Sequence, residues 1–69
     1  MTIEEVKERV EQIRLDADND DKAHCAQDAL YVDVLRAIAT LPTPRAGEGA
    51  YFAIEALKVE DIEFCRWYA

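Results

Sequence analysis

The stretch from residue 21 to residue 41 constrains the fold most, because a helix through it is apolar around most of its circumference. At about 100° per residue, one broad apolar face collects Leu30, Tyr31, Val34, Leu35, Ala37, Ile38 and Leu41. Val32 and Ala39 widen this face, which leaves mainly Asp33 and Arg36 for solvent. A helix of this kind is covered from several sides in a folded protein. We therefore expect a central helix over about 21–40, wrapped by the C-terminal third of the chain or by a second copy.

An amphipathic helix is expected before this segment. Thr2 and Glu5 have the spacing of a Thr-x-x-Glu capping box, which starts a helix. One apolar stripe then follows at steps of three and four residues: Ile3, Val6, Val10, Ile13 and Ala17. Residues 16–21, Asp-Ala-Asp-Asn-Asp-Asp, are suited to end this helix and to cap the next. A connection this short predicts an antiparallel helical hairpin.

The C-terminal third begins with a breaker-rich connection over residues 41–49, which holds both prolines and both glycines of the chain. A short helix is expected over 49–58, with Ala50, Ala53, Ile54 and Leu57 inward and with Tyr51 or Phe52 filling gaps. Residues 60–68 should add a last turn or two and dock on the hairpin through Ile62, Phe64, Trp67 and Tyr68. The sequence thus predicts one all-α domain over 1–69, a helical hairpin plus one or two short C-terminal helices.

Size and charge narrow the classes of function. A single core in 69 residues supplies only about 3–5 kcal/mol, so a homodimer or higher homo-oligomer is expected. Fifteen acidic against eight basic residues give a net charge of −7, which disfavours direct binding to nucleic acid or to an anionic membrane. No apolar run approaches the roughly 20 residues of a membrane span, and no signal peptide is visible, so a cytoplasmic protein is expected. Cys25 and Cys65 are too few for a disulfide scaffold and are expected to be reduced and mostly buried.

The acidic linker resembles a calcium loop only in part. Asp16, Asp18 and Asp20 occupy the first, third and fifth positions of such a loop. Asp21 then stands in place of the glycine that permits the sharp turn, and Gln27 stands in place of the bidentate glutamate. We interpret the linker as a helix-capping turn, and we expect neither a bound metal nor a cofactor.

A polar group at the start of the second helix is the main candidate site. His24 and Asp28 are one helical turn apart, Tyr31 continues their row, and Gln27 points toward the apolar seam. Three interpretations are open: a buried hydrogen-bond cluster that ties down the linker or the C-terminal segment, a small ligand pocket or interface, and a metal site that uses His24 and Asp28 with Cys25 or Cys65 as a further ligand. Arg66, Trp67 and Tyr68 are further candidates for ligand or partner contact, because Trp, Tyr and Arg are favoured at binding hot spots. With a single histidine, no Ser/His/Asp set and no Gly-rich phosphate loop, an enzyme is not expected.

Two stretches carry a resemblance to known sequences: Ala23-His24-x-x-x-Asp28-x-Leu30-Tyr31-x-x-Val34-Leu35-x-x-Ile38-Ala39 and Asp61-Ile62-x-Phe64-x-Arg66-Trp67-Tyr68-Ala69. Together with the capped first helix, they resemble small uncharacterised helical proteins encoded by bacteriophages and prophages. The resemblance implies an accessory or counter-defence role exerted by binding. Gln27 stands where the resemblance leads us to expect an acidic residue.

Two functions are therefore expected. The first is a non-enzymatic binding protein that acts on a protein partner through an acidic surface, formed by Glu4, Glu5, Glu8, Glu11, Asp16, Asp18, Asp20 and Asp21. Such a surface could imitate a phosphate array toward a protein that binds nucleic acid. The alternative is an oligomeric small-ligand protein that binds a nucleotide signal or a metal in a polar pocket around His24 and Asp28.

Overall fold

The computed structural model describes residues 1–66, and all the regular secondary structure in that range is helical, which confirms the predicted all-α class. Its elements are α1 (Ile3–Leu15), α2 (Asp20–Ala39), the 3₁₀ helix η1 (Thr43–Arg45), α3 (Glu48–Leu57) and the 3₁₀ helix η2 (Lys58–Asp61). Within this range, no helix combines the length and apolarity that a membrane crossing requires. The predicted turns over 60–68 are present only in part, because η2 ends at Asp61 and residues 62–66 are not helical.

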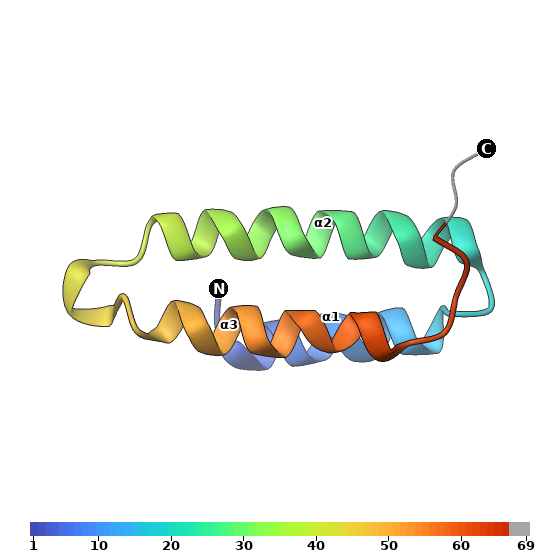
Figure 1. Cartoon of the computed structure of the whole chain (residues 1–69), viewed down its shortest axis with the longest axis horizontal. Coiled ribbons are helices and arrows are strands. Elements are labelled where there is room, and N and C mark those ends of the chain that lie inside the picture. Colours follow the sequence, from blue (N-terminus) through green and yellow to red (C-terminus); the bar gives the residue numbers. More distant parts are fainter. Residues whose placement is uncertain (67–69) are drawn as a thin grey trace.

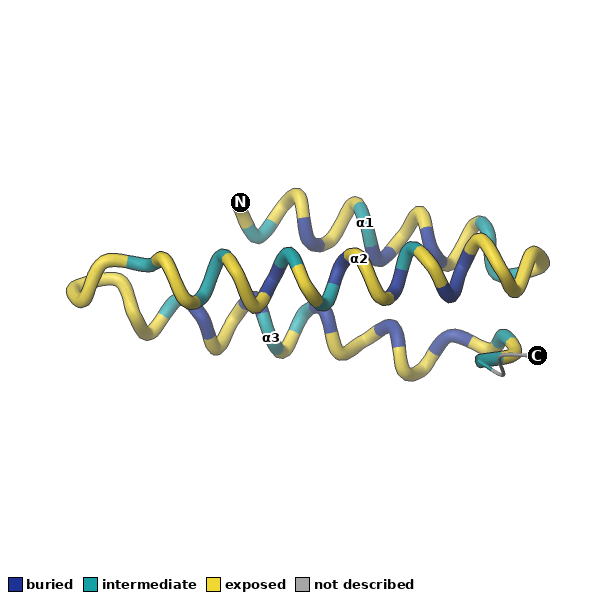
Figure 2. Tube along the Cα trace, turned by 90° about the horizontal axis from the view of Figure 1, so that it is seen from above, coloured by how far each residue is buried: buried dark blue, intermediate teal, exposed yellow. Residues whose placement is uncertain are grey.

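The chain reverses direction after α1 and again after α2 (Figure 1). α3 and α1 run side by side under α2, and the view from above separates them to either side of α2 (Figure 2). Each of these three helices contacts the other two. The result is an elongated bundle of 41 × 22 × 15 Å, in which α2 and α3 extend beyond the start of α1 (Figure 1).

Side-chain caps explain where the first two helices begin. Thr2 is the N-cap of α1, and its hydroxyl accepts a hydrogen bond from the backbone N–H of Glu5 at 3.2 Å. Asn19 is the N-cap of α2, and its side-chain oxygen accepts from the N–H of Lys22 at 3.1 Å. The linker is thus a capping turn, as predicted, with Asn19 rather than an aspartate in the capping position.

The core gathers residues from all three helices and from η2. Among residues 1–66 it consists of Val6, Val10, Ile13, Ala23, Leu30, Val34, Phe52, Ala56, Val59 and Ile62. The stripe predicted for the first helix is confirmed, because Val6, Val10 and Ile13 are buried while Ile3 and Ala17 pack against them partly buried. Burial of this kind is the main favourable contribution to folding.

The predicted inward face of the third helix is wrong. Ala50, Ile54 and Leu57 are exposed and Ala53 is half-buried, whereas the buried positions of this segment are Gly49, Phe52, Ala56 and Val59. Two features favour the observed rotation: the large Phe52 ring enters the core, and Gly49 lies against Ile38 of α2. A Cβ atom at position 49 would lie 3.1 Å from Cγ2 of Ile38, so the glycine permits this close approach.

Within the single chain α2 is covered on one side only, so the C-terminal third does not wrap it as predicted, and cover by a second copy stays a prediction. Its buried residues are Ala23, His24, Gln27, Leu30 and Val34, which form one face directed toward α1 and α3. On its outer side, Leu35 is 66% exposed and Val32 is 45% exposed. In a bundle of three helices, each helix has neighbours on one side only, so a helix with a wider apolar surface keeps part of it in contact with water.

Candidate functional site

The predicted polar residues of α2 lie on its inner side or at the edge of it. His24 and Gln27 are both buried, with 8% of their surface exposed. The Nε2 atom of His24 lies 3.7 Å from Oδ1 of Asp28, so the expected juxtaposition one helical turn apart is present. This separation fits an ion pair when the histidine is protonated, and it is too long for a hydrogen bond.

Arg66 joins this group from the C-terminal end of the described chain. Its Nε donates a hydrogen bond to the side-chain oxygen of Gln27 at 2.9 Å. Its terminal nitrogens donate to the backbone carbonyls of Val59 at 2.8 Å, Ile62 at 3.0 Å and Phe64 at 3.3 Å. The guanidinium also lies 3.9 Å from the centre of the Phe64 ring, within the range of a cation–π contact. One side chain thus satisfies carbonyl groups that the end of η2 leaves free and holds this segment against α2.

Two more hydrogen bonds hold residues 60–66 on α2. The backbone N–H of Cys65 donates to Oδ1 of Asp20 at 3.0 Å, and the hydroxyl of Tyr31 donates to Oε1 of Glu60 at 2.8 Å. Burial, followed by the hydrogen bond to Glu60, raises the pKa of the Tyr31 phenol to about 12. These contacts agree with the expectation that the C-terminal segment docks on the bundle. Trp67 and Tyr68, also predicted to contribute, lie outside the described residues.

These contacts fit the interpretation of the polar group as a buried hydrogen-bond cluster that ties down the C-terminal segment. Every buried side-chain nitrogen or oxygen in residues 1–66 has a hydrogen-bond partner. Ligand binding by His24, Gln27, Asp28, Tyr31 and Arg66 stays a prediction. Over the same residues, no three histidine, cysteine or acidic side chains come together in a way that could hold a metal ion.

The acidic linker also makes structural contacts. Asp16 is the C-cap of α1, accepts a hydrogen bond from the amide of Gln12 at 3.0 Å and lies 3.4 Å from the Lys22 ammonium. The bond from Gln12, with the nearby Lys22 charge, lowers the pKa of the Asp16 carboxyl despite partial desolvation. Asp20 lies in the first turn of α2, where its charge favours the helix N-terminus.

Both cysteines are free thiols, but the prediction that they are mostly buried is wrong. Cys25 and Cys65 are exposed. Cys25 follows His24 by about 100° around α2, which turns it away from the buried row. Cys65 lies in the non-helical segment whose backbone, rather than its thiol, is bonded to Asp20.

Two concave surfaces were not expected from the sequence. The first, the α1–α3 hollow, has a volume of about 470 Å³ and lies between the start of α1, η1 and α3. Its lining combines apolar and charged residues: Met1, Thr2, Ile3, Glu4, Lys7, Arg45, Glu48, Tyr51, Phe52, Ile54 and Glu55. It exists because α1 has 13 residues and α2 has 20, so α3 and η1 extend past the start of α1. The second, the α2–α3 groove, has about 240 Å³ and is lined by Tyr31, Val34, Leu35, Ile38, Ala53, Ala56 and Leu57.

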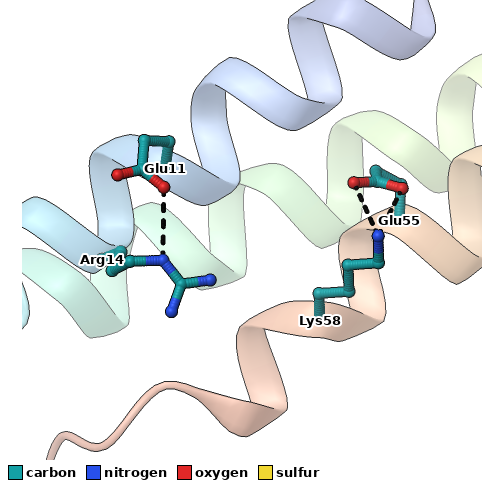
Figure 3. Close-up of polar contacts among 4 residues, drawn as sticks. All are labelled: Glu11, Arg14, Glu55 and Lys58. Atoms are coloured by element: carbon teal, nitrogen blue, oxygen red, sulfur yellow. Dashed lines mark hydrogen bonds and ion pairs between the residues drawn. The ribbon is translucent and has the colours of Figure 1, made fainter.

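Charge is distributed unequally between these surfaces. On the α1–α3 side, Arg14 lies 3.2 Å from Glu11 and Lys58 lies 3.0 Å from Glu55, and Figure 3 shows the two pairs on neighbouring helices. At the far end of the same side, the guanidinium of Arg45 donates two hydrogen bonds to the Glu48 carboxylate, which lowers the pKa of that carboxyl. The α2–α3 groove, by contrast, has no charged residue in its lining. The sequence indicates this groove only through the apolar residues Leu35 and Leu57. Their exposure depends on how α3 is rotated about its axis, which the sequence alone does not give.

Searches of protein-family models, curated proteins and solved structures found no match for this chain.

Proposed function

We propose that this chain is a small non-enzymatic binding protein that recognises a basic protein through the acidic face of α1 and the adjoining α1–α3 hollow. The observation that carries the proposal is that the two features are continuous. Glu4 lines the hollow, and Glu8 and Glu11 follow it at steps of four and three residues, which places all three on one row of α1. We refer to Glu4, Glu8 and Glu11 as the acidic row.

Exposed apolar side chains give the hollow the means to hold a partner. Tyr51 is 68% exposed, Ile54 is 59% exposed and Met1 is 39% exposed, although all three border the same cavity. A volume of about 470 Å³ falls within the range of ligand-sized cavities and can take a large side chain. An apolar anchor seated in such a pocket supplies much of the affinity of a typical interface.

The negative charge of the acidic row favours a basic partner. The acidic row is exposed, and the whole chain carries a net charge of −7. Complementary charge speeds association and disfavours acidic partners. A protein that binds nucleic acid presents the basic surface that fits this row, so the row would take the place of phosphates. The resemblance to phage- and prophage-encoded helical proteins favours a bacterial host protein as the target.

The experiment compares two variants with equal changes in charge. One replaces the acidic row, Glu4→Gln, Glu8→Gln and Glu11→Gln. The control replaces three exposed carboxylates outside the predicted acidic surface, Glu60→Gln, Asp61→Asn and Glu63→Gln. Each full-length chain is tagged, incubated with bacterial lysate at low and at high salt, and recovered with its bound proteins.

We expect the wild type and the control to recover the same basic protein in near-stoichiometric amount, and less of it at high salt. The acidic-row variant should recover about tenfold less, since three interfacial charges contribute a fraction of 1 kcal/mol to about 1 kcal/mol each. Equal loss from both triple variants, or a wild type that recovers no stoichiometric partner, would contradict the proposal.

A further inference from the structure

The α1–α3 hollow places an exposed aromatic residue among carboxylates. On α3, Tyr51 lies three residues after Glu48 and four residues before Glu55, so the three side chains share one row of the helix. All three line the hollow, and Glu4 lines it from the start of α1. Tyr51 is 68% exposed and is open to contact with a partner. From this arrangement, we propose that the hollow binds an arginine side chain of the partner. The proposal rests on the proposed function and names the group that enters the hollow.

Glu4 is the carboxylate of the lining that has no cation of this chain beside it. Glu48 accepts two hydrogen bonds from Arg45, which shows that a guanidinium fits a carboxylate of this lining. Glu55 lies 3.0 Å from the Lys58 ammonium. Among residues 1–66, the Glu4 side chain takes part in no ion pair or hydrogen bond. The lining holds three carboxylates against two basic side chains, so its charge favours a cationic group from a partner.

The apolar part of the lining suits the stem of an arginine. Ile3 and Ile54 contribute to it from the two helices, and the volume of about 470 Å³ admits a side chain of this length. The methylene groups of an arginine pack on apolar surface while the charged end reaches polar partners. Its planar guanidinium can stack on the Tyr51 ring and donate two hydrogen bonds to the Glu4 carboxylate. An ammonium is more strongly hydrated and has no plane to stack, so lysine fits the hollow less well.

Lys7 is the feature of the lining that opposes a cation. It follows Glu4 by three residues on α1, and its ammonium forms no ion pair with another described residue. Because Lys7 is exposed, its long stem can hold the ammonium in water away from the arginine. Its removal therefore has opposite effects on two classes of occupant. It should strengthen the binding of a cation and weaken the binding of an anion.

The test uses single amino-acid amides, which present one side chain without the charges of a whole partner. Acetyl-arginine amide is titrated into the isotope-labelled full-length chain at constant ionic strength, and binding is followed by the backbone amide resonances. Acetyl-citrulline amide, which has nearly the same shape without the charge, is the matched control. The amides of acetyl-lysine, acetyl-tryptophan and acetyl-glutamate represent a different cation, an apolar anchor and an anion.

Acetyl-arginine amide should cause saturable shifts at Glu4 and Tyr51, with a Kd of about 1–10 mM. Acetyl-citrulline amide and the other three amides should bind at least about threefold more weakly. Each variant below is first checked for folding by circular dichroism.

Two pairs of variants separate binding in the hollow from general attraction to a negative chain. Glu4→Gln should weaken the binding of acetyl-arginine amide about two- to fivefold. Glu5→Gln, at the neighbouring exposed carboxylate outside the lining, should not change it. Tyr51→Leu should weaken binding by a similar factor, whereas Tyr51→Phe should retain it, since the ring makes the contact. Lys7→Gln should strengthen binding.

Four results would overturn the proposal. They are equal binding of the arginine and citrulline amides, equal losses from Glu4→Gln and Glu5→Gln, weaker binding after Lys7→Gln, and tighter binding of the lysine, tryptophan or glutamate amide. The absence of any saturable shift would overturn it too. If the acidic-row variant still loses the lysate partner in that case, the proposed function stands and only the inserted side chain is wrong. If acetyl-arginine amide binds as expected but the wild type recovers no stoichiometric partner, the proposed function fails while the hollow keeps its preference for a guanidinium.

Discussion

Arg66 donates a hydrogen bond to Gln27 across 2.9 Å, which connects the end of the described chain to a buried side chain in the middle of α2. The same guanidinium bonds the carbonyls of Val59 and Ile62. It therefore determines how the segment after α3 closes over the bundle.

Replacing Arg66 should reduce stability substantially. Arg66→Ala leaves the oxygen of Gln27 and the carbonyls of Val59, Ile62 and Phe64 without this donor, and we expect a loss of about 1–3 kcal/mol. Arg66→Lys should recover little of it, since an ammonium cannot reproduce the planar fork. Urea unfolding measures the effect, and Arg36→Ala, at an exposed arginine of α2, should change stability by less than about 0.5 kcal/mol. A stable Arg66→Lys variant would show that charge alone is sufficient.

Replacing Leu30 tests the packing of the core. Its side chain is fully buried, whereas Leu15 is 67% exposed. Leu30→Ala should cost about 2–5 kcal/mol, close to the whole stability that a core of this size supplies. Circular dichroism should therefore find Leu30→Ala largely unfolded and Leu15→Ala folded. Equal melting temperatures for the two variants would show that the packing of α2 described above is wrong.

The two glycines should respond differently to alanine. Gly47 has φ −64° and ψ −22°, and a Cβ there would meet no atom within 4 Å. Gly47→Ala should therefore stabilise the protein by about 0.4–1 kcal/mol through the unfolded state. Gly49→Ala should lose that gain, because its Cβ would lie 3.1 Å from Ile38 and must displace it. Thermal unfolding distinguishes them, and an equal gain at both positions would contradict the close approach of α3 to α2.

Tyr31 should make stability depend on pH in the alkaline range. Its pKa in the folded chain, about 12, lies above its ordinary value of 10.0, so folding favours the protonated phenol. Its contribution is then fully present below pH 10.0 and is lost as the pH rises through about 12. The free energy of unfolding of the wild type should approach that of Tyr31→Phe over this interval. Tyr51→Phe, at an exposed position, should show the same alkaline loss of unfolding free energy as the wild type. If the difference in unfolding free energy between wild type and Tyr31→Phe stayed constant with pH, the Tyr31–Glu60 hydrogen bond would be refuted.

Local signals predicted the first half of the structure well. The capping pattern at Thr2 and the spacing of Val6, Val10 and Ile13 are properties of neighbouring residues, and both are confirmed. The phase of α3 was not predictable in the same way, because it depends on the contact between Gly49 and Ile38, eleven positions apart. In a helix with apolar residues on several sides, periodicity does not decide which of them turns inward.

In the candidate site, too, contacts between neighbouring residues were predictable and contacts between distant segments were not. The pairing of His24 with Asp28 follows from helical spacing and was predicted. The contact of Arg66 with Gln27 spans 39 positions and could be expected only as a docking of the C-terminal segment. The hollow and the groove result from unequal helix lengths and from the rotation of α3, which single residues do not encode.

Site-specific photo-crosslinking tests the central claim most directly. A benzophenone amino acid is introduced in place of Tyr51, at the α1–α3 hollow, or in place of Leu15; these residues are 68% and 67% exposed. In irradiated bacterial cells, position 51 should form a covalent adduct with a basic protein, and neutralising the acidic row should lower the yield of that adduct about tenfold. Adducts of equal yield from both positions, or an adduct from position 15 alone, would contradict binding through the hollow.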